Sequence, residues 1–334
     1  MSTRVIATTV QYNEEAIKIL EMTLKSFYLF NSNFDFKIYC LDNSKELFEN
    51  YFSKIAVENN FQNLEFINFK DETKWNSLIE RVKSGKLTDL EKKNMFENKA
   101  DLYVFDTMVC ISKLEIVDLL LERYDLVIMS DIDLVYLNSI EDCVQAFLES
   151  NKFIGAFEEY DNYFNAGFML FNKKYKLQLF DSAINLLKNK DLRTIKKMYS
   201  VLGRFFACFE QCLLNVLIED YFKINEYITS TVNPEKDQIK YFEQLNNKCI
   251  IHFCAISFKP FHEITQKNIP HIKDIIIPVR KFYENLFNTF DIKIKFKKSK
   301  YDQLTITNFR LYKVFNEKLK FMKRILNEKS KNRI

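Results

Sequence analysis

The stretch that decides the fold is Tyr124-Asp125-Leu126-Val127-Ile128-Met129-Ser130-Asp131-Ile132-Asp133. Its apolar run predicts a buried strand, and Asp131 and Asp133 stand where that strand should end. Side chains at positions i and i+2 of an extended chain point to one face, so the two carboxylates repel each other unless a cation lies between them. Mg²⁺ and Mn²⁺ prefer carboxylate oxygen. The pair therefore indicates a metal site, with an ordinary turn or helix cap as the alternative.

Three strand-like segments precede the aspartates and alternate with helical segments. The predicted strands are 4–10, 36–41 and 64–69, and the predicted helices are 14–30, a second one after 44 and most of 71–122. This β-α-β-α-β order implies an α/β fold with a parallel, doubly wound sheet, whose ligands bind at the carboxyl ends of central strands. Further strands are predicted over 152–157, 166–171 and 249–253, and further helices over 175–188 and 209–218.

Composition limits the class of protein. The 334 residues are 47% hydrophobic, enough for one large domain or two small ones, and no apolar run reaches the roughly 18 residues of a membrane span. The N-terminus enters a strand pattern without the features of a signal peptide, which predicts a cytoplasmic protein. Seven cysteines without C-x-x-C spacing are interpreted as reduced core residues, with a zinc site as the less favoured alternative.

Glycine is scarce, with four residues in the whole chain. The sequence therefore contains no glycine-rich loop of the kind that cradles phosphates through backbone amides. If a nucleotide binds to this chain, a metal and side chains must hold its phosphates.

Charge divides the chain into two parts. Residues 280–334 hold 16 basic and 5 acidic residues, a balance of +11, whereas residues 1–279 hold 33 basic and 40 acidic residues, a balance of −7. We predict one domain over 1–279 and a basic, amphipathic, helical C-terminal extension over 280–334. Segments 291–298 and 310–326 interleave basic with apolar residues, which suits the surface of an anionic membrane. A solvated basic helix packed on the body is the alternative, and an acidic body argues against nucleic-acid binding.

Two further motifs carry polar residues beside apolar elements. Asn165-Ala166-Gly167 leads into a predicted strand, where the amide of Asn165 suits a sugar hydroxyl and Gly167 lets a ligand approach the backbone. Gln211 follows Glu210 at the start of a predicted helix. An ordinary turn and ordinary polarity at a helix N-terminus are the respective alternatives.

A histidine and a lysine follow near the predicted strand at 249–253. His252 could complete a metal site with the two aspartates, because imidazole with carboxylates suits Mn²⁺ and its neighbours, although a packed or capping histidine is the commoner case. Lys259 stands a few residues further on, where it could meet a diphosphate.

The order of these motifs resembles the retaining GT-A glycosyltransferases of family 8, the glycogenin-like enzymes and bacterial lipopolysaccharide galactosyl- and glucosyltransferases. The resemblance rests on Asp-x-Asp, then Asn165-Ala166-Gly167, then Glu210-Gln211, then His252 with Lys259-Pro260-Phe261, and it covers about residues 4–262. It implies a GT-A, Rossmann-like fold with a mixed, mainly parallel sheet. It also implies transfer of a hexose from a nucleotide-sugar to a hydroxyl, with retention of anomeric configuration.

The resemblance also implies residue roles. Metal ligands for Mn²⁺ or Mg²⁺ would be Asp131, Asp133 and His252; donor contacts would come from Thr8, Tyr12, Lys113, Asp131, Gly167 and Lys259; and Gln211, Asn165 and Glu158 would act at the donor sugar, with Glu159 and Asp161 as alternatives to Glu158. Gln211 would lie beneath the anomeric carbon. Its amide oxygen is a poor nucleophile, so attack from the front face of the sugar is favoured over a covalent intermediate.

Several positions depart from the family pattern. No acidic residue follows the first strand to hold the base, Lys113 replaces an arginine, Ala255 replaces a glycine and Phe261 replaces a tryptophan. The chain is therefore interpreted as a divergent member. The predicted donor is UDP-galactose, UDP-glucose or UDP-N-acetylglucosamine, and the predicted acceptor is a bacterial glycan or glycolipid at the inner face of the cytoplasmic membrane.

Two other functions fit parts of the sequence. A relative that binds nucleotide-sugars without catalysis would keep the fold and lose the chemistry. Asp131-Ile132-Asp133-Leu134-Val135 also fits the motif of haloacid-dehalogenase-like phosphatases, but that motif normally ends the first strand of the fold and three predicted strands precede it here.

Overall fold

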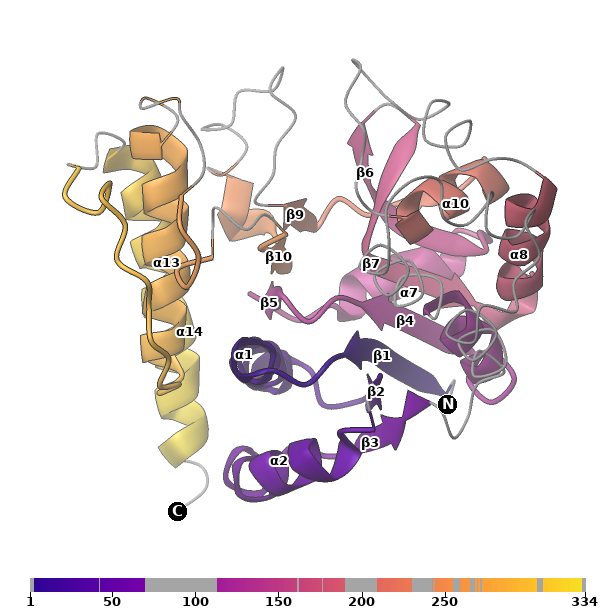
Figure 1. Ribbon diagram of the computed structural model, residues 1–334, viewed down its shortest axis with the longest axis horizontal. Helices are drawn as coiled ribbons and strands as arrows, with labels where there is room; N and C mark the ends of the chain where they lie inside the picture. The colour runs from indigo at the N-terminus through magenta and orange to yellow at the C-terminus, as the bar shows by residue number, and fades with distance from the viewer. Residues whose placement is uncertain are drawn as a thin grey trace, which may run out of the picture.

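A computed structural model describes most of the chain (Figure 1). The described residues are 3–41, 43–69, 113–160, 162–175, 177–189, 209–229, 242, 244–254, 259–264, 268, 270, 272–304 and 309–331. The helix predicted over 71–122 lies outside them up to residue 112, and residues 113–120 are helical.

The central sheet of the described residues has seven strands in the order β3-β2-β1-β4-β7-β6-β8. These strands are β1 (Arg4–Val10), β2 (Asp35–Cys40), β3 (Leu64–Asn68), β4 (Leu126–Ser130), β6 (Ile154–Tyr160), β7 (Tyr163–Asn172) and β8 (Phe222–Lys223). Strands β3, β2, β1 and β4 are parallel, whereas β7 is antiparallel to both β4 and β6. The predicted mixed, mainly parallel sheet is confirmed.

Helices connect the parallel strands, because a parallel pair needs a long crossover. Helix α1 (Glu14–Phe30) joins β1 to β2, and α2 (Lys45–Asn59) joins β2 to β3. The side chain of Asn13 caps α1 by accepting a hydrogen bond from the Ala16 amide at 2.7 Å, and two acidic residues in the first turn suit the helix dipole. The sequence therefore placed the start of α1 correctly.

Successive side chains of β4 point to opposite faces of the sheet and pack in two separate hydrophobic clusters. Val127 and Met129 pack in one hydrophobic cluster with helices α8 (Leu179–Asn189) and α10 (Phe209–Leu217). Leu126 and Ile128 pack in a second cluster with α1, α2 and α7 (Glu141–Glu149). Both faces of the sheet are thus covered, as an apolar run such as β4 requires.

A second, three-stranded sheet lies next to the end of β4. It has the order β5-β10-β9 and is built from β5 (Leu134–Tyr136), β10 (Ile250–His252) and β9 (Tyr227–Thr229). Strand β10 is antiparallel to β5, with His252 opposite Leu134, and parallel to β9. Helix α1 holds the β5 side, because Thr23 Oγ1 donates to the Leu134 carbonyl at 2.8 Å. This small sheet brings residues from three distant parts of the sequence together.

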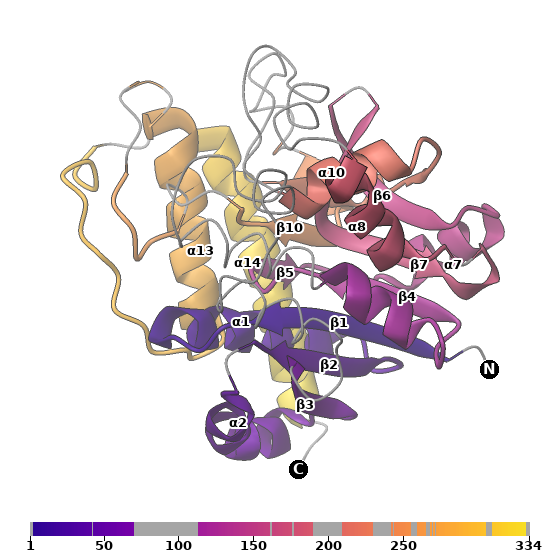
Figure 2. The same cartoon turned by 45° about the vertical axis from the view of Figure 1, so that its right-hand side comes forward.

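The C-terminal part, residues 272–304 and 309–331, contributes most of a third hydrophobic cluster. Its helices are α13 (Ile277–Thr289), which follows the π-helical turn η5 (Ile272–Ile276), and α14 (Phe309–Lys331), which contacts the short turn η3 (Gln244–Asn247). The two helices lie side by side (Figures 1 and 2). The cluster also includes Ile19 and Met22 of α1 and Ile251 of β10. Another short turn, η1 (Lys173–Tyr175), follows β7 and lies beside the first cluster.

The apolar stripe of α14 is occupied by these contacts. Leu311, Phe315, Leu319 and Met322 repeat at helical spacing and are buried, whereas the basic side chains of α14 at 310, 313, 320, 323 and 324 are exposed. The change of charge at 279/280 falls inside α13. No helix among the described residues combines the length and apolarity needed to cross a membrane.

Candidate metal centre

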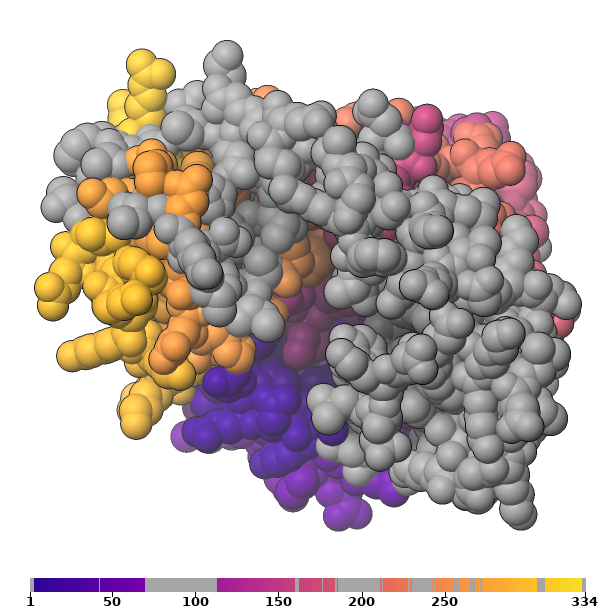
Figure 3. All heavy atoms as spheres, turned by 45° about the horizontal axis from the view of Figure 1, so that its top comes forward, coloured from indigo at the N-terminus to yellow at the C-terminus, as the bar shows by residue number. Residues whose placement is uncertain are grey.

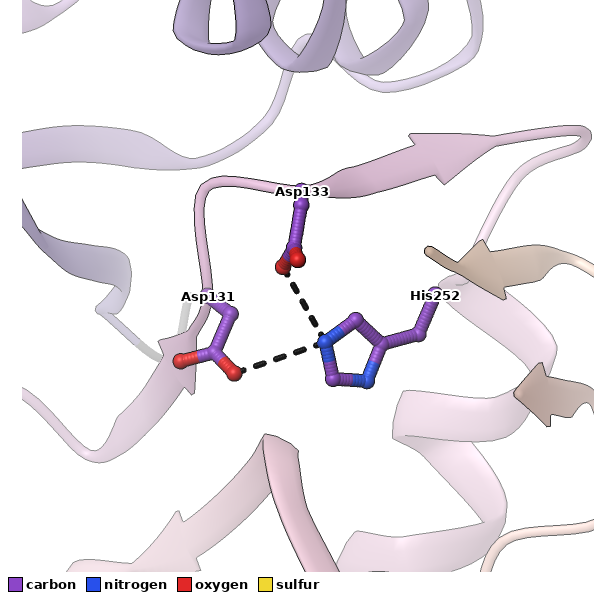
Figure 4. A group of neighbouring side chains, drawn as sticks. All are labelled: Asp131, Asp133 and His252. Atoms are coloured by element: carbon purple, nitrogen blue, oxygen red, sulfur yellow. Dashed lines mark ion pairs between the residues drawn. The ribbon is translucent and has the colours of Figure 1, made fainter. Parts of the chain in front are cut away.

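Two aspartates and a histidine meet at the end of β4 (Figure 4). His252 Nε2 lies 3.0 Å from Asp133 Oδ1 and 3.5 Å from Asp131 Oδ2. One potential ligand atom from each residue lies within 4.8 Å of the others, and no other such group occurs among the described residues. The strand register explains the meeting, because His252 is paired with Leu134, the residue after Asp133.

Backbone hydrogen bonds fix the loop that carries the aspartates. The Asp131 amide donates to the Gly167 carbonyl at 2.8 Å, and the Asp133 carbonyl accepts from the Phe253 amide at 3.0 Å. The loop is therefore tied to β7 on one side and to the residue after β10 on the other.

The histidine ring is oriented from its other nitrogen. His252 Nδ1 lies 2.5 Å from the Tyr227 hydroxyl, which donates to Asn165 Oδ1 at 2.9 Å. The Gly167 amide donates to the same oxygen at 2.8 Å. This network assigns the Nδ1 proton to the His252–Tyr227 hydrogen bond, so Nε2 is the nitrogen that faces the carboxylates, where it can hold either a proton or a metal. Two carboxylates and one oriented imidazole fit a divalent cation.

Two lysines, the buried Lys113 and the partly buried Lys259, balance the carboxylates. Lys259 Nζ lies 2.7 Å from Asp133 Oδ2, and Lys113 Nζ forms an ion pair with Asp131 Oδ1. Lys113 lies in the helical segment that includes residues 113–120, so one predicted donor lysine precedes the aspartates in the sequence and the other, Lys259, follows them.

These neighbours shift the ionisation of the site. Burial raises the pKa of the Asp133 carboxyl, but the charges of Lys259 and His252 outweigh it and hold that pKa well below its usual range. Burial lowers the pKa of His252, yet the Asp133 and Asp131 carboxylates outweigh burial and raise it. A metal would therefore compete with a proton for His252 while finding Asp133 already ionised.

Gly167 is required by the packing of the histidine. A Cβ atom at this position would lie 2.3 Å from His252 Cε1 and 2.8 Å from the Tyr227 hydroxyl. The absence of a side chain therefore lets the imidazole lie against the backbone of β7. The sequence had suggested a different reason, close approach of a ligand.

Asn165 and Gln211 converge on an acidic residue, Glu159. Gln211 Oε1 accepts from the Ala166 amide at 3.0 Å, and Gln211 Nε2 donates to Glu159 Oε2 at 3.0 Å. Asn165 Nδ2 donates to the same carboxylate oxygen at 3.3 Å. Burial raises the pKa of Glu159, against the opposing effect of these two amides. Two of the three predicted sugar-side residues, Asn165 and Gln211, thus form one network with Glu159 beside the metal ligands.

Glu158 lies elsewhere. Its Oε1 atom forms an ion pair with Lys223 at 2.7 Å and accepts from the Tyr221 hydroxyl at 3.1 Å. The pairing of β6 with β7 shifts register between Glu158 and Tyr160, so strand alternation alone does not decide which of Glu158 and Glu159 faces Gln211. The structure places Glu159 there. Asp161, the third alternative, lies outside the described residues.

Two of the predicted donor contacts, Thr8 and Tyr12, differ in exposure. Thr8 is fully buried in β1 opposite Ser130, on the strand face that also carries the core residues Ile6 and Val10. Tyr12 is 41% exposed and contacts Phe48 edge-on. Of this predicted pair, Tyr12 is open to a ligand and Thr8 is enclosed in the core.

Sequence reasoning missed Tyr227. Nothing near this residue marks it, because its contact with His252 arises from the parallel pairing of β9 with β10. Only a prediction of that pairing could have found it.

Comparison with known proteins gives no family by sequence: no protein family model matches the chain, and no curated protein is significantly similar to it. Solved structures are similar. The apo form of mouse xyloside xylosyltransferase 1 gives a TM-score of 0.50 at 13% identity, over 76% of this chain and 98% of that one. The galactosyltransferase LgtC, in complex with donor and acceptor sugar analogs, gives a TM-score of 0.43 at 15% identity, over 77% and 89%. The glycosyltransferase GlyE of Streptococcus pneumoniae gives 0.43 at 14% identity, over 99% and 64%.

At such low identity, similarity defines the fold alone. The mixed sheet flanked by helices, together with the match to nearly the whole xylosyltransferase, confirms the predicted GT-A, Rossmann-like fold. What the chain does must be argued from its own site.

Proposed function

We propose that this protein is a metal-dependent glycosyltransferase that moves a hexose from a nucleotide-sugar, UDP-galactose, UDP-glucose or UDP-N-acetylglucosamine, to a hydroxyl acceptor. One observation carries the proposal: Asp131, Asp133 and His252 converge, with Lys259 beside them, at the carboxyl end of β4 in a GT-A fold. This is the edge at which open α/β sheets bind their ligands.

The leaving group explains the charges. Bound to these three residues, Mn²⁺ or Mg²⁺ would act as a Lewis acid toward a nucleoside diphosphate. Lys259 and Lys113 each pair with one aspartate, and each can turn its ammonium group toward phosphate oxygens that enter the site. A chain that is poor in glycine thereby holds phosphates with side chains.

The sugar would lie beside Asn165, Gln211 and Glu159. Both groups of the Gln211 amide are engaged, the oxygen by the Ala166 amide and the nitrogen by Glu159, so the side chain is held in place. An amide oxygen is a poor nucleophile, which favours retention through front-face attack, with the leaving phosphate taking the acceptor proton. We assign the binding of sugar hydroxyls to Glu159 in preference to Glu158, because Glu159 contacts both amides.

The acceptor is proposed to be a bacterial glycan or glycolipid, reached at the cytoplasmic side of the membrane. The exposed basic side chains of α14 suit anionic lipid, and the burial of its apolar stripe makes the attraction electrostatic, hence sensitive to salt. Full-length protein should sediment with anionic liposomes at low salt, and the variant Lys320→Glu/Lys323→Glu/Arg324→Glu should remain in solution. Equal sedimentation of both proteins contradicts the membrane contact.

A thermal-shift panel tests the function. UDP-, GDP- and CMP-sugars are compared with and without Mn²⁺, because a ligand that binds the folded state raises the unfolding temperature. We expect a UDP-sugar with Mn²⁺ to give the largest shift. Asp133→Ala should lose that shift and metal-dependent turnover while keeping its circular dichroism spectrum, and Asp181→Asn, on the surface of α8, should behave as wild type.

Three results would contradict the assignment. Turnover by Asp133→Ala at the wild-type rate would contradict the role of Asp133 as a metal ligand. Binding of UDP-sugar without transfer or hydrolysis indicates the non-catalytic relative. Release of phosphate from phosphomonoesters, without sugar transfer, indicates the phosphatase.

A further inference from the structure

Arg280 is a buried cation in the first turns of α13, with 3% of its surface exposed. Its guanidinium donates to three backbone carbonyls of one short segment: His262 at 2.7 Å, Lys259 at 3.1 Å and Pro260 at 3.2 Å. The carbonyl of Lys297 lies 3.5 Å away. Burying a charge is costly unless its donors are satisfied, and the planar fork of arginine can satisfy several carbonyls at once.

The segment 259–262 is the turn that carries Lys259. The His262 amide closes it by donating to the Lys259 carbonyl at 3.1 Å, and the Lys297 amide donates to the Pro260 carbonyl at 2.9 Å. Phe261 is buried in the C-terminal hydrophobic cluster. The turn is therefore held from the C-terminal side by Arg280, by residue 297 and by apolar packing.

This turn connects the C-terminal part with the metal centre, because Arg280 contacts its backbone and Lys259 extends from it to Asp133, with the ion pair at 2.7 Å. In the space-filling view the orange C-terminal residues border the indigo N-terminal part of the molecule (Figure 3). The basic C-terminal part thus reaches the site through the backbone of 259–262.

We propose that Arg280 is a positioning residue that fixes this turn and so presents Lys259 to Asp133 and to the diphosphate. Its effect on the donor rests on the proposed function, whereas its hold on the turn does not. A lysine side chain has several rotatable bonds, and a displacement of about 1 Å in a positioned group can cost about 100-fold in rate. The C-terminal part is accordingly a component of the donor site.

Hydrogen exchange of the ligand-free, full-length protein tests the hold on the turn. Arg280→Lys keeps the charge but loses the fork, so amide exchange should rise in peptides that cover 259–264 and 297, with β1 and β4 unchanged. Arg324→Lys, an exposed arginine on α14, is the matched control and should change nothing. A uniform rise across all peptides, or no rise at 259–264, overturns the proposal.

A double-mutant cycle tests the action through Lys259. The affinity for UDP with Mn²⁺ is measured by calorimetry for wild type, Arg280→Lys, Lys259→Met and the double variant. We expect Arg280→Lys to weaken binding about tenfold and to add less than about threefold once Lys259 is gone, since both act on one contact. Fully additive losses overturn the positioning role. If wild type binds no UDP, the donor assignment fails and the exchange experiment still decides whether Arg280 holds the turn.

Discussion

The two regions that build the metal centre are held in different ways. Asp131 and Asp133 follow a fully buried strand of the central sheet, and backbone hydrogen bonds tie Asp131 to β7 and Asp133 to the residue after β10. His252 and Lys259 come from a three-residue strand and a turn much later in the chain, and side chains hold both: Tyr227 orients His252, and Arg280 caps the turn of Lys259. The central sheet places the aspartates, whereas His252 is placed by the short strand β10 and oriented by one contact with Tyr227, and Lys259 is placed by a turn that Arg280 caps. Substitutions at those contacts should damage the site more than they damage the protein.

We expect the largest loss of metal affinity from Gly167→Ala. The new Cβ would lie 2.3 Å from the ring of His252, so the ring must move away from the aspartates. We expect Mn²⁺ affinity to fall by more than about 100-fold and stability to fall by about 1–3 kcal/mol. Electron paramagnetic resonance of Mn²⁺ and thermal unfolding measure the two effects.

Gly155→Ala is the matched control. Gly155 lies in β6, and a Cβ atom there would lie 2.9 Å from the Phe147 side chain of α7, which does not contact the metal ligands. That variant should lose stability and keep its Mn²⁺ affinity. Wild-type Mn²⁺ affinity in Gly167→Ala would show that His252 does not need the space.

We expect a smaller loss of metal affinity from Tyr227→Phe, which keeps the ring and removes the hydroxyl between His252 and Asn165. Residues that orient a metal-bound histidine typically contribute 10- to 100-fold in metal affinity, and we expect a loss of about that size. Tyr28→Phe removes a comparable hydrogen bond, 2.6 Å long, to the Gln62 carbonyl and should leave metal affinity unchanged. Equal Mn²⁺ affinities for the two variants would contradict the orienting role.

The smallest effect is expected from a change of pH. A rise in pH should lower the stability of the metal-free protein and increase its affinity for Mn²⁺. The raised pKa of His252 means that its ion pairs stabilise the metal-free protein below the usual pKa of 6.5, and this contribution is lost as pH rises through the folded-state pKa. Mn²⁺ needs the deprotonated ring, so its affinity should fall as pH drops below that folded-state pKa. Unfolding temperatures across a pH series should therefore show a Mn²⁺-induced shift that grows with pH. A shift independent of pH would exclude His252 as a ligand.

Much of the fold could be predicted because its signals are local. Strand and helix periodicity located β1, α1, β3 and β4 to within a residue or two. The order of motifs also grouped Asp131, Asp133, His252 and Lys259, which the structure brings together. The choice between Glu158 and Glu159 could not be made in this way, because adjacent residues of a strand differ only in the face that they occupy.

Local patterns in the sequence fix the elements and their chemical groups: a buried strand that ends in two carboxylates, an imidazole and a lysine near a short strand, and too little glycine for a phosphate loop. Only the tertiary structure decided how those groups are held. Tyr227 reaches His252 through strand pairing, Gly167 is small because a ring lies against it, and Arg280, one basic residue among many in the sequence, is buried against the turn of Lys259. The physical reason is that orientation, burial and backbone capping are contacts between distant segments, and no local pattern in a sequence records them.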